Sequence, residues 1–374
     1  MKANVADIIT MMNTIAPPDL AEQWDNVGLQ VGLAEWNVHK IRIALDPTSQ
    51  VMTDACNSGV DLLITHHPLI FKPLKSIDLN TAAGRIIDQA IQSKTAVFAA
   101  HTNLDIVSGG VNDVLADRIG LKNTTVLDET ADGGKLKLVV YVPEINEQKI
   151  LQALMECGVG VIGEYSGCIF RSRGTGTFKP GDKAVPFSGN IGVINSVEET
   201  RIEALVEKKD INATIAHLRS RHPYETMAYD IYPLVTAENH HGLGRVGELE
   251  KDMYLKDFGR IIGERLGFEN LRIAGNPDLR VSKAAVCSGS GSGLMRHFFS
   301  CGAQVYISGD LGYHNARDVE SQNLGLIDIG HFASEHLIID SVAKRLRKMA
   351  LDGKMDIHID TCMMERDPFW NIGE

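Results

Sequence analysis

The chain has 374 residues, of which 44% are hydrophobic. This length is too great for one ordinary domain core and the apolar share too high for a disordered chain, so we expect two or more packed domains. The 37 Lys and Arg against 48 Asp and Glu give a formal charge of −11, which disfavours a large surface for nucleic acid or anionic membrane. No apolar run approaches the roughly 20 residues of a membrane span, and the start lacks a signal-peptide cleavage pattern, so a cytoplasmic protein is predicted.

Six cysteines are scattered along the sequence without a C-x-x-C pair. This spacing indicates neither a disulfide framework nor a zinc site built from thiolates. The sequence also contains no P-loop, no G-x-S-x-G motif and no dinucleotide fingerprint with its acidic partner. The noteworthy count is that of the histidines, which number 13.

The outer parts of the chain alternate between apolar strands and helices. An amphipathic helix is expected within the first 20 residues, because apolar positions recur with helical spacing until Pro17-Pro18 ends the pattern. Such alternation predicts a parallel sheet with covering helices. The expected strands are 41–46, 60–65, 95–100, 283–289, 303–309 and 324–330, and the expected helices are 49–58, 81–92, 293–301, 314–322 and 333–351.

The middle of the chain follows a different order of elements. A strand at 136–142 and a helix at 147–157 precede two β-rich stretches at 165–178 and 190–206; a helix at 210–220 and a strand at 225–234 follow. This β-α-β-β-α-β order is the ferredoxin-like arrangement. We therefore predict an inserted domain at 129–240, within an α/β host formed by residues 1–128 and 241–374.

Three segments that contain histidine each follow an apolar strand, and they are the strongest functional signal in the sequence. In open α/β sheets, sites form in the crevice beyond the carboxyl ends of the strands, so the three segments are expected to converge. The segments are His66-His67 after 62–65, His101 to Asp105 after 97–100, and His331 to Glu335 after 326–329.

Spacing within the segments suggests how their side chains are directed. His331 and Glu335 are four residues apart, so a helix that begins after Gly330 would place both on one face and direct them to the same ion. His66 and His67 are adjacent and would diverge at a strand end, each serving a different ion.

The third segment is less regular. His101 and Asp105 are also four residues apart, but Asn103 suggests a loop between them. Their coordination of one ion is therefore less clearly indicated than that of the other pair.

Two divalent ions per chain are consistent with the charges of these residues. Neutral imidazoles from His66, His67 and His331, together with carboxylates from Asp105 and Glu335, leave net positive charge for hydroxide or phosphate. Mixed nitrogen and oxygen ligands suit zinc, iron, manganese, nickel or cobalt, and the sequence does not choose among them. Two such ions would lower the pKa of a bound water and clamp an oxyanion.

Three further motifs are weaker candidates for a functional role. The glycine-rich segment 287–294 could present backbone N–H groups to a phosphate, although such turns are usually only turns. Asp310 and His314 lie at another strand end and could support the site or contact substrate. Structure alone could explain the segment WDNVGLQVG at 24–32.

Together these residues resemble the Nif-three-like family, also called GTP cyclohydrolase I type 2 homologs. The likeness covers both halves of the host, and the middle resembles the PII/CutA-like insert of longer bacterial members, with HPYET at 222–226. The host segments that carry the resemblance are WDNVGLQVG (24–32), ITHHPLIF (64–71), AAHTNLD (99–105), GSGSG (289–293), SGDLGYH (308–314) and DIGHFASEH (328–336).

The resemblance implies an α/β fold with a two-metal site that faces the cavity of a toroidal homohexamer, a trimer of dimers. It implies the following roles: His66 and His331 bind one ion, His67 and Asp105 bind the other, Glu335 bridges them, and His101 is a sixth ligand or a proton-transfer group. One departure is Leu311-Gly312, which stands where many members carry a lysine before the tyrosine.

Two functions follow as hypotheses. The first is a metal-dependent hydrolase of nucleotides or phosphorylated small molecules, with GTP cyclohydrolase activity as the candidate that the family name suggests. Its partner would be a small anionic substrate, with no role for membrane and none expected for nucleic acid. The alternative is a metal-binding regulatory or scaffold protein, whose PII-like insert binds a ligand or partner.

Overall fold

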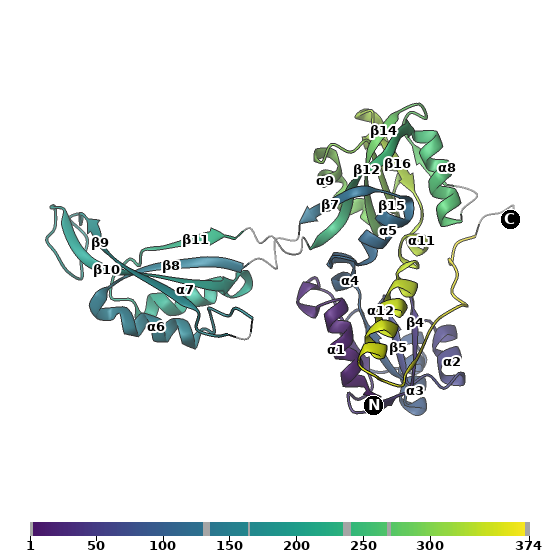
Figure 1. Ribbon diagram of the computed structural model, residues 1–374, viewed down its shortest axis with the longest axis horizontal. Coiled ribbons are helices and arrows are strands. Elements are labelled where there is room, and N and C mark those ends of the chain that lie inside the picture. Colours follow the sequence, from purple (N-terminus) through teal and green to yellow (C-terminus); the bar gives the residue numbers. More distant parts are fainter. Residues whose placement is uncertain (1–2, 130–134, 164, 235–240, 268–270, 371–374) are drawn as a thin grey trace. The chain divides into compact units, whose positions relative to one another are not determined.

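The computed structural model describes residues 3–129, 135–163, 165–234, 241–267 and 271–370. The chain divides into two compact units, one formed by Met1–Thr130 with Asn239–Glu374 and the other by Ala131–Glu238 (Figure 1). The sequence places the limits of the insertion at 129 and 240. Residue 240 lies outside the described residues, and both limits stay predictions.

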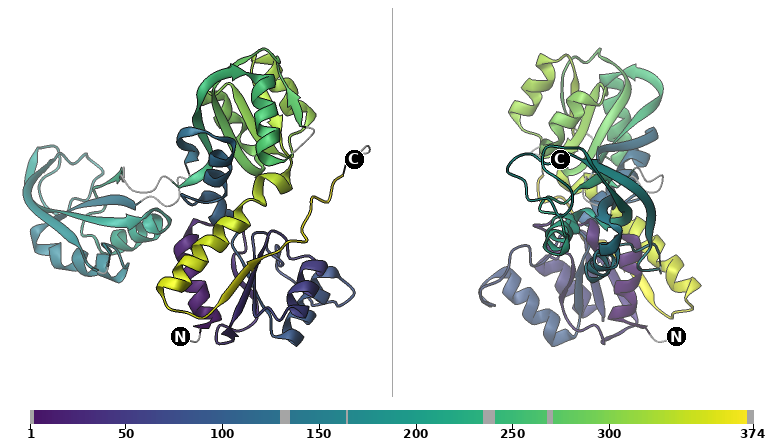
Figure 2. Two further views of the ribbon diagram at one scale, coloured as in Figure 1. Left: turned by 45° about the vertical axis from the view of Figure 1, so that its right-hand side comes forward. Right: turned by 90° about the vertical axis from the view of Figure 1, so that its left-hand side faces the viewer.

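The first unit contains a five-stranded sheet in the order β17-β4-β5-β6-β2. The first four strands run parallel to their neighbours, whereas β2 is antiparallel to β6. Alternate strand residues face opposite sides, and α1 and α12 cover one face while α2 and α3 cover the other. Figure 2 shows α12 beside α1 in both views. The bounds are β17 His358–Thr361, β4 Lys40–Ala44, β5 Leu62–Thr65, β6 Ala96–Ala99, β2 Gly28–Val31, α1 Val5–Ile15, α2 Ser49–Asn57, α3 Ala82–Ser93 and α12 Ile338–Asp352.

A second sheet of the same unit has six strands in the order β13-β16-β15-β14-β12-β7. Its central strands β14, β15 and β16 are parallel, and the flanking strands β13, β12 and β7 are antiparallel to their neighbours. Helices α5 and α8 pack on one face, and α9 and α10 pack on the other. The bounds are β13 Arg272–Ala274, β16 Gly325–Asp328, β15 Val305–Gly309, β14 Arg280–Ser290, β12 Gly242–Tyr254, β7 Lys122–Glu129, α5 Val111–Ile119, α8 Leu255–Leu266, α9 Met295–Ser300 and α10 Tyr313–Ser321.

The host therefore differs from the single parallel sheet that the sequence suggested. It has two mixed sheets, because β2, β7, β12 and β13 add antiparallel strands at or near the edges. The expected helix at 333–351 is divided, with a one-turn helix α11 before α12. The remaining short elements are β1 Ala3–Asn4, β3 Asn37–Val38, η1 Pro18–Leu20, α4 Thr102–Ile106, η4 Gly291–Leu294 and α11 His331–Glu335.

The second unit has the element order β-α-β-β-α-β, which is the ferredoxin-like order. Its four strands form an antiparallel sheet in the order β11-β8-β10-β9, and α6 and α7 supply the helical side of its core. The bounds are β8 Lys135–Pro143, η2 Glu144–Asn146, α6 Glu147–Glu156, β9 Ile169–Phe178, β10 Asn195–Glu207, η3 Lys208–Asp210, α7 Ile211–Arg221 and β11 Tyr229–Pro233.

The helices of the described residues are short or amphipathic. None of them combines the length and the apolar character that crossing a membrane requires.

Candidate metal centre

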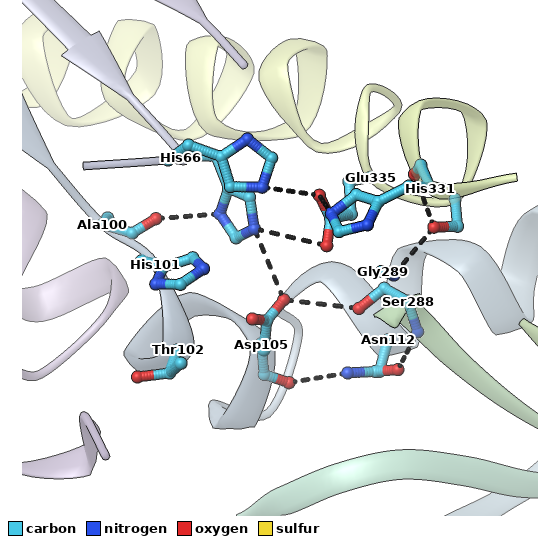
Figure 3. Close-up of polar contacts among 12 residues, drawn as sticks. His66, Ala100, His101, Thr102, Asp105, Asn112, Ser288, Gly289, His331 and Glu335 are labelled. Atoms are coloured by element: carbon cyan, nitrogen blue, oxygen red, sulfur yellow. Dashed lines mark hydrogen bonds and ion pairs between the residues drawn. The ribbon is translucent and has the colours of Figure 1, made fainter. Parts of the chain in front are cut away.

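Strand ends from both sheets of the first unit bring the predicted ligands together (Figure 3). His66 and His67 directly follow β5, as predicted from the sequence, and His101 lies two residues beyond β6. The loop expected around Asn103 is wrong, since 102–106 form the short helix α4 that carries Asp105. Polar residues after a buried strand thus gather where the two sheets' strand ends meet.

The six-stranded sheet contributes the remaining two ligands through α11. This helix begins immediately after Gly330, so His331 and Glu335 share one face, as their spacing predicted. Gly330 has a φ of +75°, which lets the chain turn sharply from β16 into the helix. Glu335 is consequently directed inward and is buried.

Glu335 is common to two groups of three potential ligands. Its Oε1 lies 3.8 Å from His66 Nε2, which is 3.6 Å from Asp105 Oδ1. Its Oε2 lies 3.0 Å from His67 Nε2 and 3.1 Å from His331 Nε2. Within each group the donor atoms all lie within 4.8 Å of one another. One carboxylate therefore faces two donor sets, which is the geometry of a shared ligand.

These groups differ from the pairing that the resemblance implied. The resemblance paired His66 with His331 and His67 with Asp105. In the structure, His66 is grouped with Asp105, and His67 is grouped with His331. The reason is the direction of the two neighbouring rings: His66 turns toward the end of β6, where its Nδ1 meets the Ala100 carbonyl. His67 turns toward the end of β4, where its Nδ1 contacts the carboxylate of Asp46, two residues beyond that strand.

The His66 contact also fixes which ring nitrogen faces the centre as a ligand. Its Nδ1 lies 2.9 Å from the carbonyl oxygen of Ala100, which can only accept a hydrogen bond. Nδ1 must therefore donate, and in the neutral ring Nε2 carries a lone pair directed at Asp105 and Glu335. This arrangement is typical of a metal-ligating histidine.

The other three rings are held in the same way by carboxylates. Each Nδ1 donates to an aspartate at or near a strand end, so each Nε2 is left for the centre. The pairs are His67 with Asp46 at 2.8 Å, His331 with Asp310 at 2.8 Å and His101 with Asp25 at 2.9 Å. Asp310 was a weak candidate from the sequence, whereas Asp25 and Asp46 were missed, although Asp46 also follows a strand and could have been found by the same argument.

The carboxylates also change the proton affinity of the rings. Burial lowers the pKa of His67, but attraction to Asp46 and Glu335 outweighs it and raises that pKa to about 10. The Glu335 carboxylate, supported by Asp310, likewise raises the pKa of His331 to about 9 despite burial. A metal ion would therefore compete with protons for these nitrogens.

The buried acids respond in opposite directions. Burial raises the pKa of Asp105, with the Glu335 charge adding to it and His66 opposing it. For Glu335 burial acts in the same sense, but His331 and His66 outweigh it and hold the pKa well below the usual range. Glu335 is thus the anionic member around which the imidazoles gather.

Cations fit this set of side chains. Among the described residues, His66 Nε2 and Glu335 Oε2 are buried polar atoms without a properly oriented hydrogen-bond partner. Burying such atoms unpaired is costly, and an ion between them would remove that cost. Exposure rises across the site, from 1% for the His66 side chain to 23% for His67 and 38% for His331. The second donor group is therefore the open one, where solvent or a ligand can approach.

The glycine-rich segment supports the centre through close packing. Gly289 has a φ of +60°, and a Cβ at this position would lie 2.2 Å from Glu335 Oε1. Its N–H donates to Ser334 Oγ, so this N–H does not support the phosphate contact that the sequence suggested. The neighbouring Ser288 hydroxyl donates to Asp105 Oδ1 at 3.3 Å. His314 belongs to none of the donor groups found among the described residues.

The whole sequence was compared with those of known protein families. The sequence profile of the family described as Duf34/NIF3 (NGG1p interacting factor 3) matches residues 3–368. The chain belongs to the Duf34/NIF3 family. The match includes both parts of the host and the insertion.

Relatives with similar sequence extend over nearly the full chain. A Bacillus subtilis protein named GTP cyclohydrolase 1 type 2 homolog is 39% identical over 366 residues, which cover 98% of each chain. Among solved structures, a Bacillus cereus protein described as related to NIF3 is 37% identical, with a TM-score of 0.70 and 99% of both chains covered. A Staphylococcus aureus structure has a TM-score of 0.75 at 31% identity and 99% coverage of both chains. The host with its insertion is thus shared with Duf34/NIF3 relatives.

Proposed function

We propose that this member of the Duf34/NIF3 family is a metal-dependent hydrolase of nucleotides or phosphorylated small molecules, with two divalent ions per chain. The observation that carries the proposal is Glu335, which faces one buried and one open set of nitrogen and oxygen donors. A structural zinc site has four closed protein ligands, whereas a site with three donors on an exposed side has room for substrate.

The residues around the centre have distinct parts in this proposal. His66 and Asp105 would hold the buried ion, His67 and His331 would hold the open one, and Glu335 would be shared between them. Bound ions would supply an activated water and a positive clamp for a substrate oxyanion. Zinc, iron, manganese and nickel all suit this donor set.

His101 is the candidate catalytic residue for proton transfer. Its ring centroid lies 5.2 Å from that of His66 and 5.6 Å from that of His67. Because its Nδ1 is held by Asp25, Nε2 is left to accept or return a proton beside the ions. A role as a sixth ligand is the second reading of the same geometry, since His66, His67 and His101 also form a donor group.

The name of the Bacillus subtilis relative suggests the reaction to be tried first. Opening the imidazole ring of GTP requires water to attack a ring carbon and a proton donor for the nitrogen that leaves. Hydrolysis of a phosphoester requires the same activated water and the same clamp. We propose a cytoplasmic homohexamer of toroidal form, built as a trimer of dimers, as the assembly in which this occurs.

Glu335→Gln tests the proposal, because glutamine keeps the shape of the side chain but cannot serve as an anionic ligand to two ions. Partners outside the ligand set typically contribute roughly 10- to 100-fold to metal affinity, so loss of the shared ligand is expected to exceed this. Metal content is measured by ICP-MS, and turnover of GTP and generic phosphodiesters is assayed with each metal.

Glu320→Gln, an exposed change on α10, is the matched control and is expected to behave as wild type. Size-exclusion chromatography must show the same assembly for both variants. Unchanged metal content and turnover in Glu335→Gln would refute the hydrolase proposal.

A regulatory function is the second candidate, and a cavity of the insertion favours it. The cavity has a volume of about 280 Å³ and is lined by Phe178, Lys179, Phe187 and Tyr224 among others. The Tyr224 hydroxyl donates to Glu199 at 2.7 Å, and burial together with this carboxylate raises the pKa of Tyr224. A PII/CutA-like insert with such a pocket could bind a small ligand. Full metal occupancy without turnover of any substrate would favour this function.

A further inference from the structure

Two exposed aromatic side chains lie beside the candidate metal centre. Trp24 is 58% exposed and Phe71 is 45% exposed. Their ring centroids are 5.6 Å apart, and they lie 6.1 Å and 6.2 Å, respectively, from that of His101. Large aromatic rings that remain exposed next to a reactive centre are suited to ligand contact.

The segment at 24–32, for which the sequence required only a structural role, holds this aromatic pair in place. Asn26 Nδ2 donates to the carbonyl of Ile70 at 2.5 Å, and the N–H of Ile70 donates to Gln30 Oε1 at 2.8 Å. Gln30 Nε2 in turn donates to the Asn26 carbonyl at 2.7 Å. The backbone N–H and the carbonyl of Ile70 are therefore both fixed immediately before Phe71.

The same segment is also tied to the centre itself. Asp25 accepts hydrogen bonds from His101 Nδ1 and from the N–H of Thr102. These bonds hold the pKa of Asp25 at about 2 although burial alone would raise it. Trp24 and His101 are thus positioned by one short stretch of chain, so their spacing is set before any ligand arrives.

Positive charge accompanies the aromatic pair. Lys72 directly follows Phe71, and Lys75 is three residues further along the same exposed loop. Neither lysine makes an ion pair with any residue that the structure describes. In a chain with a formal charge of −11, two such lysines on the loop that carries Phe71 favour an anion that carries an aromatic ring.

We propose that Trp24 stacks on the planar heterocyclic ring of the substrate, a nucleobase, while Phe71, whose ring is tilted by 58° to that of Trp24, contacts the edge of the base and the phosphate is directed to the metal centre. The inference rests on the proposed hydrolase function and narrows its substrate class to nucleotides. Stacking suits this task because every base presents a π-face, and the pre-positioned rings lose little freedom on binding.

Isothermal titration calorimetry of the zinc-loaded full chain tests the proposal with two probes. GMP carries a base, sugar and phosphate, whereas ribose 5-phosphate lacks only the base. We expect GMP to bind at least ten-fold more tightly. Trp24→Ala is expected to weaken GMP binding about ten-fold, equivalent to ~1.4 kcal/mol, and to leave ribose 5-phosphate binding unchanged.

Trp370→Ala is the matched control, because Trp370 is 78% exposed and makes none of the ring contacts found among the described residues. Phe71→Leu keeps an apolar side chain without a ring, and it is expected to reproduce the selective loss of GMP affinity. Equal affinities for the two probes, or equal weakening of both by Trp24→Ala, would overturn the inference.

Failure of the proposed aromatic site can be distinguished from failure of the hydrolase proposal. Trp24-dependent GMP binding without turnover retains the aromatic site and rejects the hydrolase. Turnover of phosphoesters that lack a base, at the same kcat/KM as nucleotides, retains the hydrolase and overturns the aromatic site. If size-exclusion chromatography showed a change of assembly in Trp24→Ala, the surface formed by Trp24 and Phe71 would be a contact between subunits. That result would overturn the inference as well.

Discussion

At the scale of single residues, ring orientation decides how the candidate ligands are shared. His66 is oriented by the carbonyl of Ala100, 34 residues away, and His67 by Asp46, 21 residues away. The sequence could locate both histidines from their place after an apolar strand. It could not predict which donor group each joins, because the Nδ1 acceptors come from two different neighbouring strands.

Asp310→Asn is expected to weaken metal binding roughly 10- to 100-fold, because it removes the charge that makes His331 a stronger base. Asparagine is chosen because Asp310 has a φ of +55°, a conformation that asparagine tolerates. A competition titration against a chelator measures the affinity.

Asp318→Asn, an exposed change on α10, provides the comparison and should retain wild-type affinity. Equal affinity in the two variants would show that the contact between Asp310 and His331 does not support a metal ligand.

At the scale of elements, short helices after buried strands position the site. The spacing of His331 and Glu335 was enough to predict that they share a helical face, and α11 confirms it. The strands β7 and β12 were not predicted, because their charged residues interrupt the apolar pattern and their pairing joins segments on either side of the insertion. Local patterns thus identify strands buried on both faces better than strands exposed on one.

Gly289→Ala tests the close approach between β14 and α11. A methyl group would collide with Glu335 Oε1 and would occupy a left-handed conformation, so a destabilisation of about 2 kcal/mol is expected. Loss of bound metal should accompany it, since Glu335 must move. Thermal unfolding and ICP-MS measure the two effects.

Gly293→Ala is the matched control in the same segment. A Cβ at Gly293 meets no atom within 4 Å, and its φ is not in the left-handed region. If both substitutions were equally harmless, the contact between the segment and Glu335 would not constrain the site.

At the scale of the whole molecule, the order of elements predicted an α/β host and a β-α-β-β-α-β unit between its halves, and both element orders are present. The division of the host into two sheets was not predicted. Alternating strands and helices are compatible with one sheet or two, and only the antiparallel strands and their distant partners distinguish these cases.

Stability of the metal-free protein is expected to fall as the pH rises from 6.5 to about 10. The folded protein raises the pKa of His67 to about 10 and that of His331 to about 9, above the ordinary value of 6.5. Protonated rings therefore stabilise the folded state fully below 6.5, and this contribution is lost as the pH passes through the raised values.

With a fixed excess of zinc the trend should reverse, because ions replace the protons and bind more tightly as the pH rises. Thermal unfolding midpoints at several pH values, with and without zinc, provide the measurement. Parallel curves under the two conditions would contradict the expected competition.

The pairing of Gly242 with Glu129 has a consequence for how the host could have acquired its second unit. The chain leaves β7 and re-enters β12 at directly opposed positions of an antiparallel pair, so these strands form a hairpin whose turn has been replaced by a folded domain. Loop-closure entropy grows only slowly with length, by about 0.6 kcal/mol per doubling for a flexible connection. Exchanging a tight turn for an independently packed domain would thus have left the register of the sheet, and the centre at its far strands, largely unaffected.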